Sequence, residues 1–260
     1  MLLAVLAAFL LSSFQPKDKK EEGWIQLFNG KDLHDWKIKI TGYDLGVNYK
    51  NTFRVEDGLL KVRYDQYDRF NGQFGHIFYK KNFSHYLLRV EYRFVGEQAE
   101  GGQTWARLNS GIMIHGQSPE SMEKDQQFPT SIEVQLLGKN ENEERTNLNV
   151  CTPGTNIVMD GKLITEHCIN STLQAYLPGQ WVTAEVEVRG DSIIKHIING
   201  QVVMQYSKPQ LDERDPTYQK LLPSDGDKIL HGGSISLQSE SHPIDFRKVE
   251  LLNLGDDDCD

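Results

Sequence analysis

Basic residues and cysteines are both scarce in this sequence. It has 28 Lys and Arg residues against 37 Asp and Glu residues, so its net charge is −9 at pH 7. A nucleic-acid partner would require clustered Lys and Arg for phosphate contacts, and the charge balance argues against one. The three cysteines, Cys151, Cys168 and Cys259, have no CxxC spacing and do not predict a structural zinc site. In an oxidising compartment Cys151 and Cys168 could pair, and closing that short loop would contribute roughly 3 kcal/mol in the chain-entropy model.

Long apolar runs are absent except at the N-terminus. Residues 1–14, MLLAVLAAFLLSSF, are too short for a membrane-spanning helix, which needs about 20 apolar residues. Together with the charged spacer QPKDKKEE, they predict a signal peptide and spacer over residues 1–22. We therefore expect export to the periplasm, the cell surface or the medium, and no membrane span. The end of the chain, GDDDCD, predicts an acidic tail over residues 255–260, which leaves residues 23–254 as a single domain.

Sustained helical periodicity is also missing after the N-terminal run. Apolar residues instead alternate with polar ones, as in HYLLRVEYRFV (85–95) and VTAEVEVRG (182–190), which is the pattern of half-buried antiparallel strands. Asp57-Gly58 and Asn199-Gly200 lie between apolar runs and predict hairpin turns. Residues 208–222 could hold one helical turn, broken at Pro216. Many short strands without a βαβ rhythm predict an all-β fold, a two-sheet antiparallel sandwich or jelly roll.

The strand SIEVQLLG (131–138) carries a polar face. Ile132, Val134 and Leu136 point one way, so Glu133 and Gln135 point the other. If neighbouring strands share one bowed sheet, their polar residues line a single groove in which amides hold hydroxyl groups, while carboxylates and imidazoles move protons. Such a groove suits a carbohydrate, for which Trp105 could supply an apolar platform. The other candidates for this groove are Asn109, His115, His196, Gln238 and Glu240.

Simpler interpretations compete with this one. Any half-exposed sheet carries Glu, Gln and His on its solvated face, and His196, between Ile194 and Ile198, could equally be a packing residue. A metal site formed by His115, Glu133 and His196 is conceivable, but nothing in their spacing demands it, so we expect no metal and no cofactor. Five other histidines have no pattern that distinguishes them from ordinary surface residues: His34, His76, His85, His167 and His231. The sequence has no GxSxG nucleophile motif, no nucleotide-binding glycine loop and no HExxH motif.

Five motifs occur together in one order along the chain. They are GWIQLFNGKDLHDWK, NSGIMIHG, SIEVQLLG, HIINGQVV and GGSISLQSESHPIDFRKVELLNL, and they extend from Gly23 to Leu254. In these motifs the chain resembles the 3-keto-disaccharide hydrolase domain family. The resemblance implies a concanavalin-like jelly roll, an exported bacterial protein, and cleavage of a glycosidic bond in a sugar already oxidised at carbon 3.

The resemblance also implies a mechanism and roles for residues. A ketone at C3 acidifies the proton on C2, so a base can remove it, the group at C1 is expelled, and water adds afterwards. Glu133 matches the carboxylate of the EVQ motif and is expected to be the base or acid, with His196 as its partner. Asn109, Gln135 and His115 would hold hydroxyl groups or the developing oxyanion. The alternative is a carbohydrate-binding module of the same fold without catalysis.

Two positions depart from the family pattern. His115 stands near the place where an arginine often follows the NSGI strand. Ile197 replaces the indole of the usual HWLNG stretch. Both departures concern contacts with the sugar rather than the fold, so they indicate a different sugar or an inactive relative.

Overall fold

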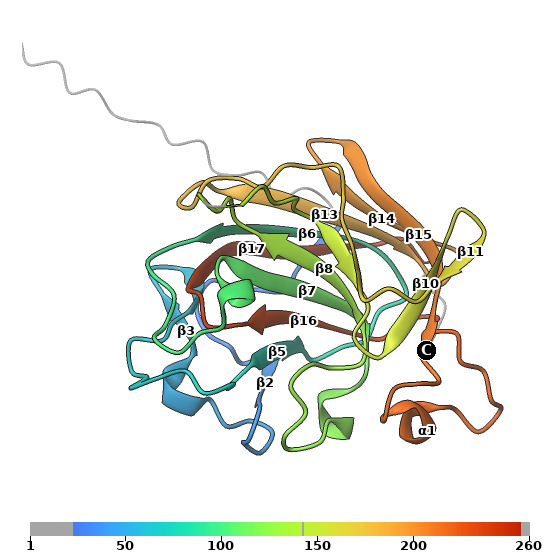
Figure 1. Ribbon diagram of the computed structural model, residues 1–260, viewed down its shortest axis with the longest axis horizontal. Helices are drawn as coiled ribbons and strands as arrows, with labels where there is room; N and C mark the ends of the chain where they lie inside the picture. Colours follow the sequence, from blue (N-terminus) through green and yellow to red (C-terminus); the bar gives the residue numbers. More distant parts are fainter. Residues whose placement is uncertain (1–22, 142, 256–260) are drawn as a thin grey trace, which may run out of the picture.

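The computed structural model describes residues 23–141 and 143–255. These residues form a sandwich of two antiparallel β-sheets, with one short helix at the periphery (Figure 1). The prediction of an all-β, two-sheet jelly roll is confirmed. The predicted signal peptide and spacer (1–22) and residues 256–260 of the predicted tail lie outside the described residues, and the domain boundaries stay a prediction.

The larger sheet contains ten strands. Along the sheet they are ordered β11 (Lys162–Ile164), β10 (Thr155–Met159), β15 (Gln201–Leu211), β14 (Ile193–Ile198), β13 (Val182–Arg189), β6 (His85–Phe94), β17 (Ile244–Asn253), β4 (Leu59–Val62) and β3 (Phe53–Glu56). A further short strand, β1 (Trp24–Gln26), pairs with β17.

The smaller sheet contains seven strands and carries most of the residues discussed below. Their order is β12 (Cys168–Ile169), β9 (Asn149–Cys151), β8 (Ile132–Leu137), β7 (Asn109–Gly116), β16 (Ser234–Ser239), β5 (Gly75–Tyr79) and β2 (Trp36–Ile40). Helix α1 spans Tyr218–Leu221, and single 3-10 turns occur at Tyr49–Asn51, Thr104–Ala106 and Pro119–Ser121.

The predicted local elements are present. Asp57 and Gly58 join β3 to β4, and Asn199 and Gly200 join β14 to β15; all four have positive φ, as two-residue hairpin turns of the primed types require. The single helical turn expected within residues 208–222 is α1. Among the described residues, no helix is long and apolar enough to cross a membrane.

The core lies between the two sheets and follows the alternation in the sequence. On β6 the residues Tyr86, Leu88, Val90, Tyr92 and Phe94 are buried in alternation with half-exposed ones. Burying each such side chain contributes about 1.5–3 kcal/mol. The aliphatic side of β8 packs into this core, so the side with Glu133 and Gln135 faces away from it. The fold thereby decides which face of the smaller sheet is free to form a site.

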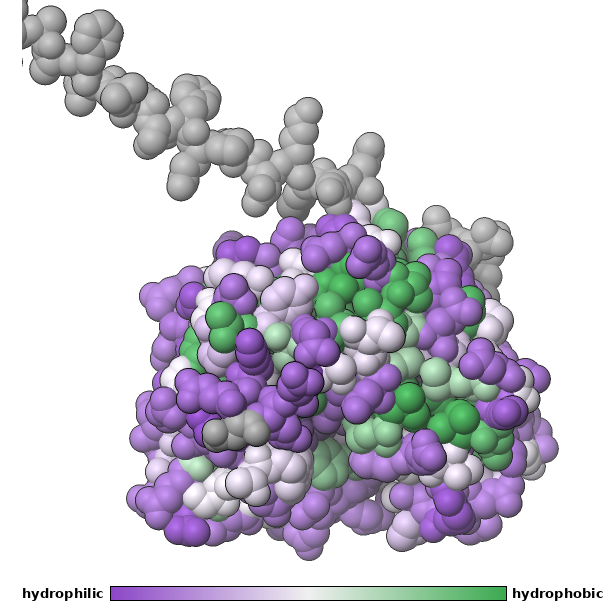
Figure 2. Space-filling model, turned by 45° about the horizontal axis from the view of Figure 1, so that its top comes forward, coloured by the Kyte–Doolittle hydropathy of each residue, from purple (hydrophilic) through white to green (hydrophobic). Residues whose placement is uncertain are grey.

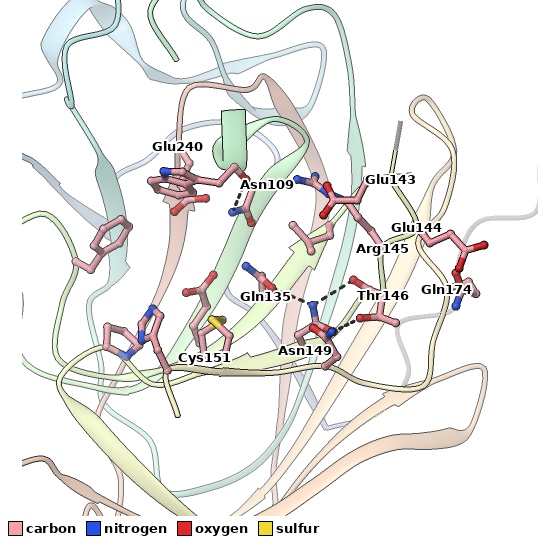
Figure 3. A pocket seen from close by; sticks show the side chains of 18 residues that line it. Asn109, Gln135, Glu143, Glu144, Arg145, Thr146, Asn149, Cys151, Gln174 and Glu240 are labelled. Carbon is pink, nitrogen blue, oxygen red and sulfur yellow. Dashed lines mark hydrogen bonds and ion pairs between the residues drawn. A yellow bond between two sulfur atoms is a disulfide. The ribbon is translucent and has the colours of Figure 1, made fainter. Parts of the chain in front are cut away.

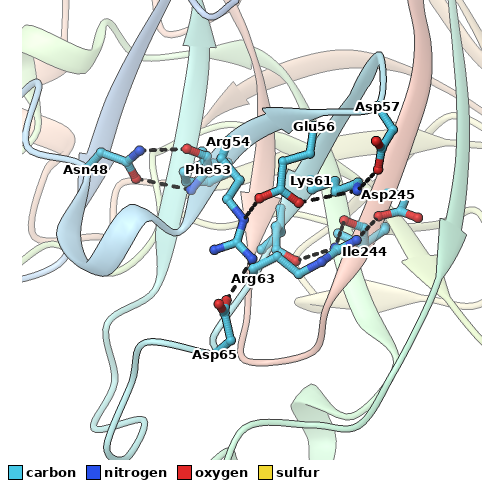
Figure 4. A network of polar contacts seen from close by, with 11 residues as sticks. Asn48, Phe53, Arg54, Glu56, Asp57, Lys61, Arg63, Asp65, Ile244 and Asp245 are labelled. Atoms are coloured by element: carbon cyan, nitrogen blue, oxygen red, sulfur yellow. Dashed lines mark hydrogen bonds and ion pairs between the residues drawn. The ribbon is translucent and has the colours of Figure 1, made fainter.

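Charged side chains tie the β3–β4 hairpin to β17 on the larger sheet (Figure 4). The Asp245 carboxylate, whose side chain is only 2% exposed, pairs with both Arg63 and Arg93. Arg54 and Lys61 form further ion pairs on the hairpin. Removing the arginine partners of Asp245 would leave its charge buried and unpaired, which strongly destabilises a folded protein. We therefore assign this network a structural role.

The surface seen in Figure 2 is mostly hydrophilic, with hydrophobic residues gathered in a few patches. The large apolar side chains that are exposed include Trp105, at 48% exposure. Single exposed apolar residues are ordinary, but a half-exposed indole beside a pocket indicates a contact surface.

Candidate active site

A pocket of about 630 Å³ lies on the side of the smaller sheet that faces away from the core. Strands β7, β8 and β9 form its floor, and the loops after β8, before β8 and around β12 form its walls. The structure brings five of the sequence-predicted site residues into its lining: Trp105, Asn109, Glu133, Gln135 and Glu240. The pocket therefore gathers residues from four distant parts of the chain, as Figure 3 shows.

Four glutamates line this pocket, and two of them, Glu133 and Glu240, are buried. Glu133, on β8, is 6% exposed, and burial raises its pKa from 4.5 to about 8. Glu240, directly after β16, is 3% exposed; burial, and then the charge of Glu133, hold its pKa well above the ordinary value. Burial therefore favours the protonated form of both groups, and an ionised Glu133 favours the protonated form of Glu240 further. Pairs of carboxyl groups with separated pKa values are a common arrangement for a base and an acid.

The backbone of β7 leaves room for these side chains because it has a glycine at position 111. A methyl group on Gly111 would lie 2.7 Å from Glu133 Oε1 and 3.0 Å from Gln238 Oε1. Even alanine would therefore clash with the carboxyl group. Glycine is required here for close approach of side chains, since its own backbone is in the extended region of a strand.

Amide groups on neighbouring strands hold one another in place on the pocket floor (Figure 3). Asn149 Nδ2 donates to Gln135 Oε1 at 2.9 Å, and Thr146 Oγ1 donates to Asn149 Oδ1 at 2.8 Å. Because its oxygen accepts from Asn149, Gln135 is oriented with its NH₂ group available to a ligand. Asn109 Oδ1 is buried with no partner among the described residues. Such oriented amides suit a ligand rich in hydroxyl groups.

An aromatic wall bounds the pocket near Glu240. Trp105 stacks on Phe74, with ring centroids 5.7 Å apart, and Phe74 contacts Phe128 at 5.0 Å. Trp105 and Phe128 both line the pocket. The indole is thus supported from behind by packed rings, which fixes its orientation; its use as a sugar platform stays a prediction.

A disulfide joins Cys151 of β9 to Cys168 of β12, so the pairing that the sequence left open is present. Both cysteines line the pocket, and the bond holds the segment carrying His167 and Asn170 against the floor. The disulfide is therefore part of the pocket wall as well as a cross-link.

Residues 23–252 match the family described as 3-keto-alpha-glucoside-1,2-lyase-like domains. This chain belongs to that family. The match confirms the family that the sequence motifs indicated. None of the curated protein sequences is significantly similar to this chain.

Solved structures share the fold of this family member at low sequence identity. A putative glycosyl hydrolase from Parabacteroides distasonis is 22% identical, with a TM-score of 0.52, covering 90% of this chain and 95% of that chain. A β-glucanase from Bacillus licheniformis is 13% identical, with a TM-score of 0.50, covering 88% and 97%. A protein of unknown function with a galectin-like fold from Bacillus subtilis is 10% identical, with a TM-score of 0.52, covering 88% and 94%. At these identities the likeness establishes the jelly-roll fold alone.

His196 does not lie in the pocket, so its prediction as a catalytic partner is wrong. It is fully buried between the sheets, with Nδ1 2.9 Å from the Leu148 carbonyl oxygen and Nε2 2.9 Å from the Tyr206 hydroxyl. Burial lowers its pKa to about 4. Both ring nitrogens are satisfied, so the packing interpretation of His196 holds.

His115 is also outside the pocket, and the expectation that it holds substrate is wrong. It lies at a register shift between β7 and β16 with φ of 50°, and its Nε2 is 3.2 Å from the carbonyl oxygen of Gly190 in the β13–β14 turn. The conceivable metal set of His115, Glu133 and His196 is therefore not assembled. Within residues 23–141 and 143–255, no three His, Cys, Asp or Glu side chains are grouped so that they could hold a metal ion.

Gln238 and His76 lie behind the pocket. Gln238, predicted to bind substrate, is fully buried and does not line the pocket, although it lies beside Glu133 over Gly111. His76, predicted to be surface background, is fully buried and pairs in register with Gln238 across β5 and β16. Burial lowers its pKa to about 3.

Several lining residues were not predicted. The loop from β8 to β9 contributes Glu143, Arg145 and Thr146, and Arg145 is anchored by Glu143 and by the carbonyl oxygen of Arg107. The only sequence signal for these residues was that the loop is long and polar, which is frequent in functional loops. Phe128, Asn149, Asn170 and Gln174 gave no signal of their own.

Proposed function

We propose that this protein cleaves the glycosidic bond of 3-keto sugars, either 3-keto-disaccharides or 3-keto-glucosides, after export from the cell. The observation that carries this proposal is the buried carboxyl pair, Glu133 and Glu240, in an amide-lined pocket of a chain that belongs to this family. The N-terminal apolar run and the disulfide between Cys151 and Cys168 support export, since disulfides persist in oxidising compartments.

Glu133, once ionised, is the base in this proposal. It takes the proton from C2 of the keto sugar, and the electron pair left on C2 forms the C2=C3 double bond of an enolate, with the negative charge on the C3 oxygen. The NH₂ group of Gln135 is placed on the same floor and would donate to the developing oxyanion. Burial of Glu133 makes its ionised form strongly basic, which suits abstraction of a carbon-bound proton.

Glu240 is the acid. Burial and the charge of an ionised Glu133 both raise the pKa of its carboxyl group, which favours the protonated form, so it can donate its proton to the oxygen leaving C1 as that bond breaks. The C1–O bond is thereby replaced by a C1–C2 double bond, and one proton has moved from the sugar to Glu133. Addition of water across the double bond completes hydrolysis: the OH of water binds C1, its other proton returns to Glu240, and the proton held by Glu133 returns to C2.

The test compares oxidised and unoxidised substrates. Purified protein is incubated with 3-keto-glucosides and with their parent glucosides, and the released aglycone is measured. Turnover of the keto sugars alone supports the proposal, whereas turnover of the parents alone refutes it. Binding of either sugar without turnover would instead assign a carbohydrate-binding module.

Two variants test whether the Glu133 carboxyl group is the base. Glu133→Gln keeps the shape of the side chain but cannot accept a proton, so kcat should fall about 10²–10⁴-fold while the sugar still binds. Glu187→Gln, on β13 of the larger sheet, is the matched control and should keep full activity.

A further inference from the structure

A row of polar residues crosses the smaller sheet on its pocket side, one residue on each successive strand except for the glycine of β7. Lys39 pairs with His76, His76 with Gln238, Gly111 with Gln135, and Gln135 with Asn149. Gln238 follows Leu237, which pairs with Ile112, so it lies beside Gly111. Gln135 and Asn149 of this row line the pocket. Gln238 and His76 are buried behind it, with the His76 ring against Phe128.

Gln238 and His76, the buried residues of the row, carry polar atoms that have no hydrogen-bond partner among the described residues. Both amide atoms of Gln238, both ring nitrogens of His76 and Oε1 of Glu133 have no hydrogen-bond partner among the described residues. Each such group costs about 1–3 kcal/mol if it stays unpaired, and native proteins rarely keep several together. Stability alone therefore does not account for an amide and an imidazole at these positions.

The geometry over Gly111 connects Gln238 to the carboxyl group. Glu133 Oε1 and Gln238 Oε1 lie 2.7 and 3.0 Å from the same point above that glycine. The amide oxygen therefore borders the carboxyl group, and it can accept a hydrogen bond from neutral Glu133 when the two side chains turn toward each other. An ionised Glu133 needs a donor instead, and the amide supplies one when it turns by 180° and presents Nε2.

We propose that Gln238 and His76 are positioning residues for Glu133, and that the Gln238 amide turns over each time Glu133 exchanges its proton. His76 is the in-register neighbour of Gln238, and neither of its ring nitrogens has a partner among the described residues. A neutral imidazole carries one donor and one acceptor nitrogen and can turn about χ2, so in this proposal it turns toward the other end of the amide in either orientation. No proton enters or leaves His76 in this cycle. The inference rests on the proposed function only in one respect, the reaction in which Glu133 uses this proton.

The surrounding charges allow His76 to act without ionising. Burial, and then the charge of Lys39 on β2, keep the pKa of His76 far below neutrality. Lys39 itself donates to the carbonyl oxygens of Ile40 and Lys124. The titratable or charged groups that share the pocket with Glu133 are Glu240, His167, Glu143, Glu144 and Arg145. Burial, and then the charge of Glu133, raise the pKa of Glu240.

The test measures the proton on Glu133 directly, by carbon-detected NMR titration of the ¹³C-labelled side-chain carboxyl groups, with Glu133→Gln used to assign the signal. Gln238→Met keeps length and volume but removes both polar atoms. Both forms of Glu133 then lose a partner, but the hydrogen bond to the ionised form is the stronger one, so the titration midpoint should rise by about one pH unit. The limb of the kcat/KM profile set by Glu133 should move by the same amount, with a smaller change in KM. Gln210→Met, a buried glutamine of β15, is the matched control.

His76 supplies a second, independent variant. His76→Phe should shift the midpoint in the same direction by a smaller amount, and His76→Gln, which keeps a donor and an acceptor, should restore it. An unchanged midpoint in folded Gln238→Met or His76→Phe protein overturns the inference. A shifted midpoint without turnover of any keto sugar would leave the inference standing and reject the proposed function.

Discussion

Removal of the carboxyl group at position 133 is expected to change how stability depends on pH. Glu133 has a pKa of about 8 in the folded protein and about 4.5 in the unfolded chain. Between these values the unfolded chain releases a proton that the folded protein retains. The free energy of unfolding therefore falls by about 1.4 kcal/mol for each pH unit of increase, or about 5 kcal/mol over the whole interval. The contribution is fully present below pH 4.5 and is lost as pH rises through 8.

The measurement is urea unfolding of Glu240→Gln and of the double variant Glu240→Gln/Glu133→Gln at pH 5, 6, 7, 8 and 9. With Glu240 replaced in both proteins, only Glu133 titrates at the site. The single variant should lose stability relative to the double variant between pH 5 and 8 and run parallel to it above pH 9. Glu97→Gln, at an exposed position, is the control and should show no such divergence. A difference that stays constant within 1 kcal/mol across this range would refute burial of a protonated Glu133.

Three further predictions concern the pocket wall, the core histidine and the indole. Cys168→Ser should lower the free energy of unfolding by about 3 kcal/mol, and a wild-type melting temperature insensitive to reductant would contradict this. His196→Leu leaves the Leu148 carbonyl and the Tyr206 hydroxyl unpaired, so the free energy of unfolding in urea should fall by about 1–3 kcal/mol for each. A loss of sugar binding without loss of stability would instead show that His196 acts in the sugar site. Trp105→Ala should weaken sugar binding by about 0.5–1.5 kcal/mol in calorimetry with little change in stability. An unchanged affinity would show that the indole does not pack against the sugar.

The sequence alone could assign the faces of some strands but not of others. On β8, polar and aliphatic residues alternate cleanly, so Glu133 and Gln135 had to lie on one side of the sheet. On β14, Ile193 and Ile197 lie in one phase and Ile194 and Ile198 in the other, so alternation does not decide where His196 points. It points into the core, because only there do the Leu148 carbonyl and the Tyr206 hydroxyl satisfy its ring.

The interpretation of His115 and His76 failed for a different reason. His115 lies at a break in strand register, which turns its side chain toward Gly190. His76 occupies a strand that is buried on both faces, because the loop carrying Phe128 covers the pocket side of the sheet. Neither a register break nor cover by a remote loop leaves a periodic signal in the sequence.

The sequence by itself determined the fold class, the hairpin turns and the polar face of the strand that carries Glu133, because period-two alternation and Asn-Gly or Asp-Gly turns act locally. Only the tertiary structure decided which polar residues meet, because a sheet joins strands that are far apart in the chain. It placed Glu240 and Glu133 in one pocket, left room for Glu133 and Gln238 over Gly111, and buried both carboxyl groups deeply enough to raise their pKa values. The chemistry of the site is a consequence of that burial.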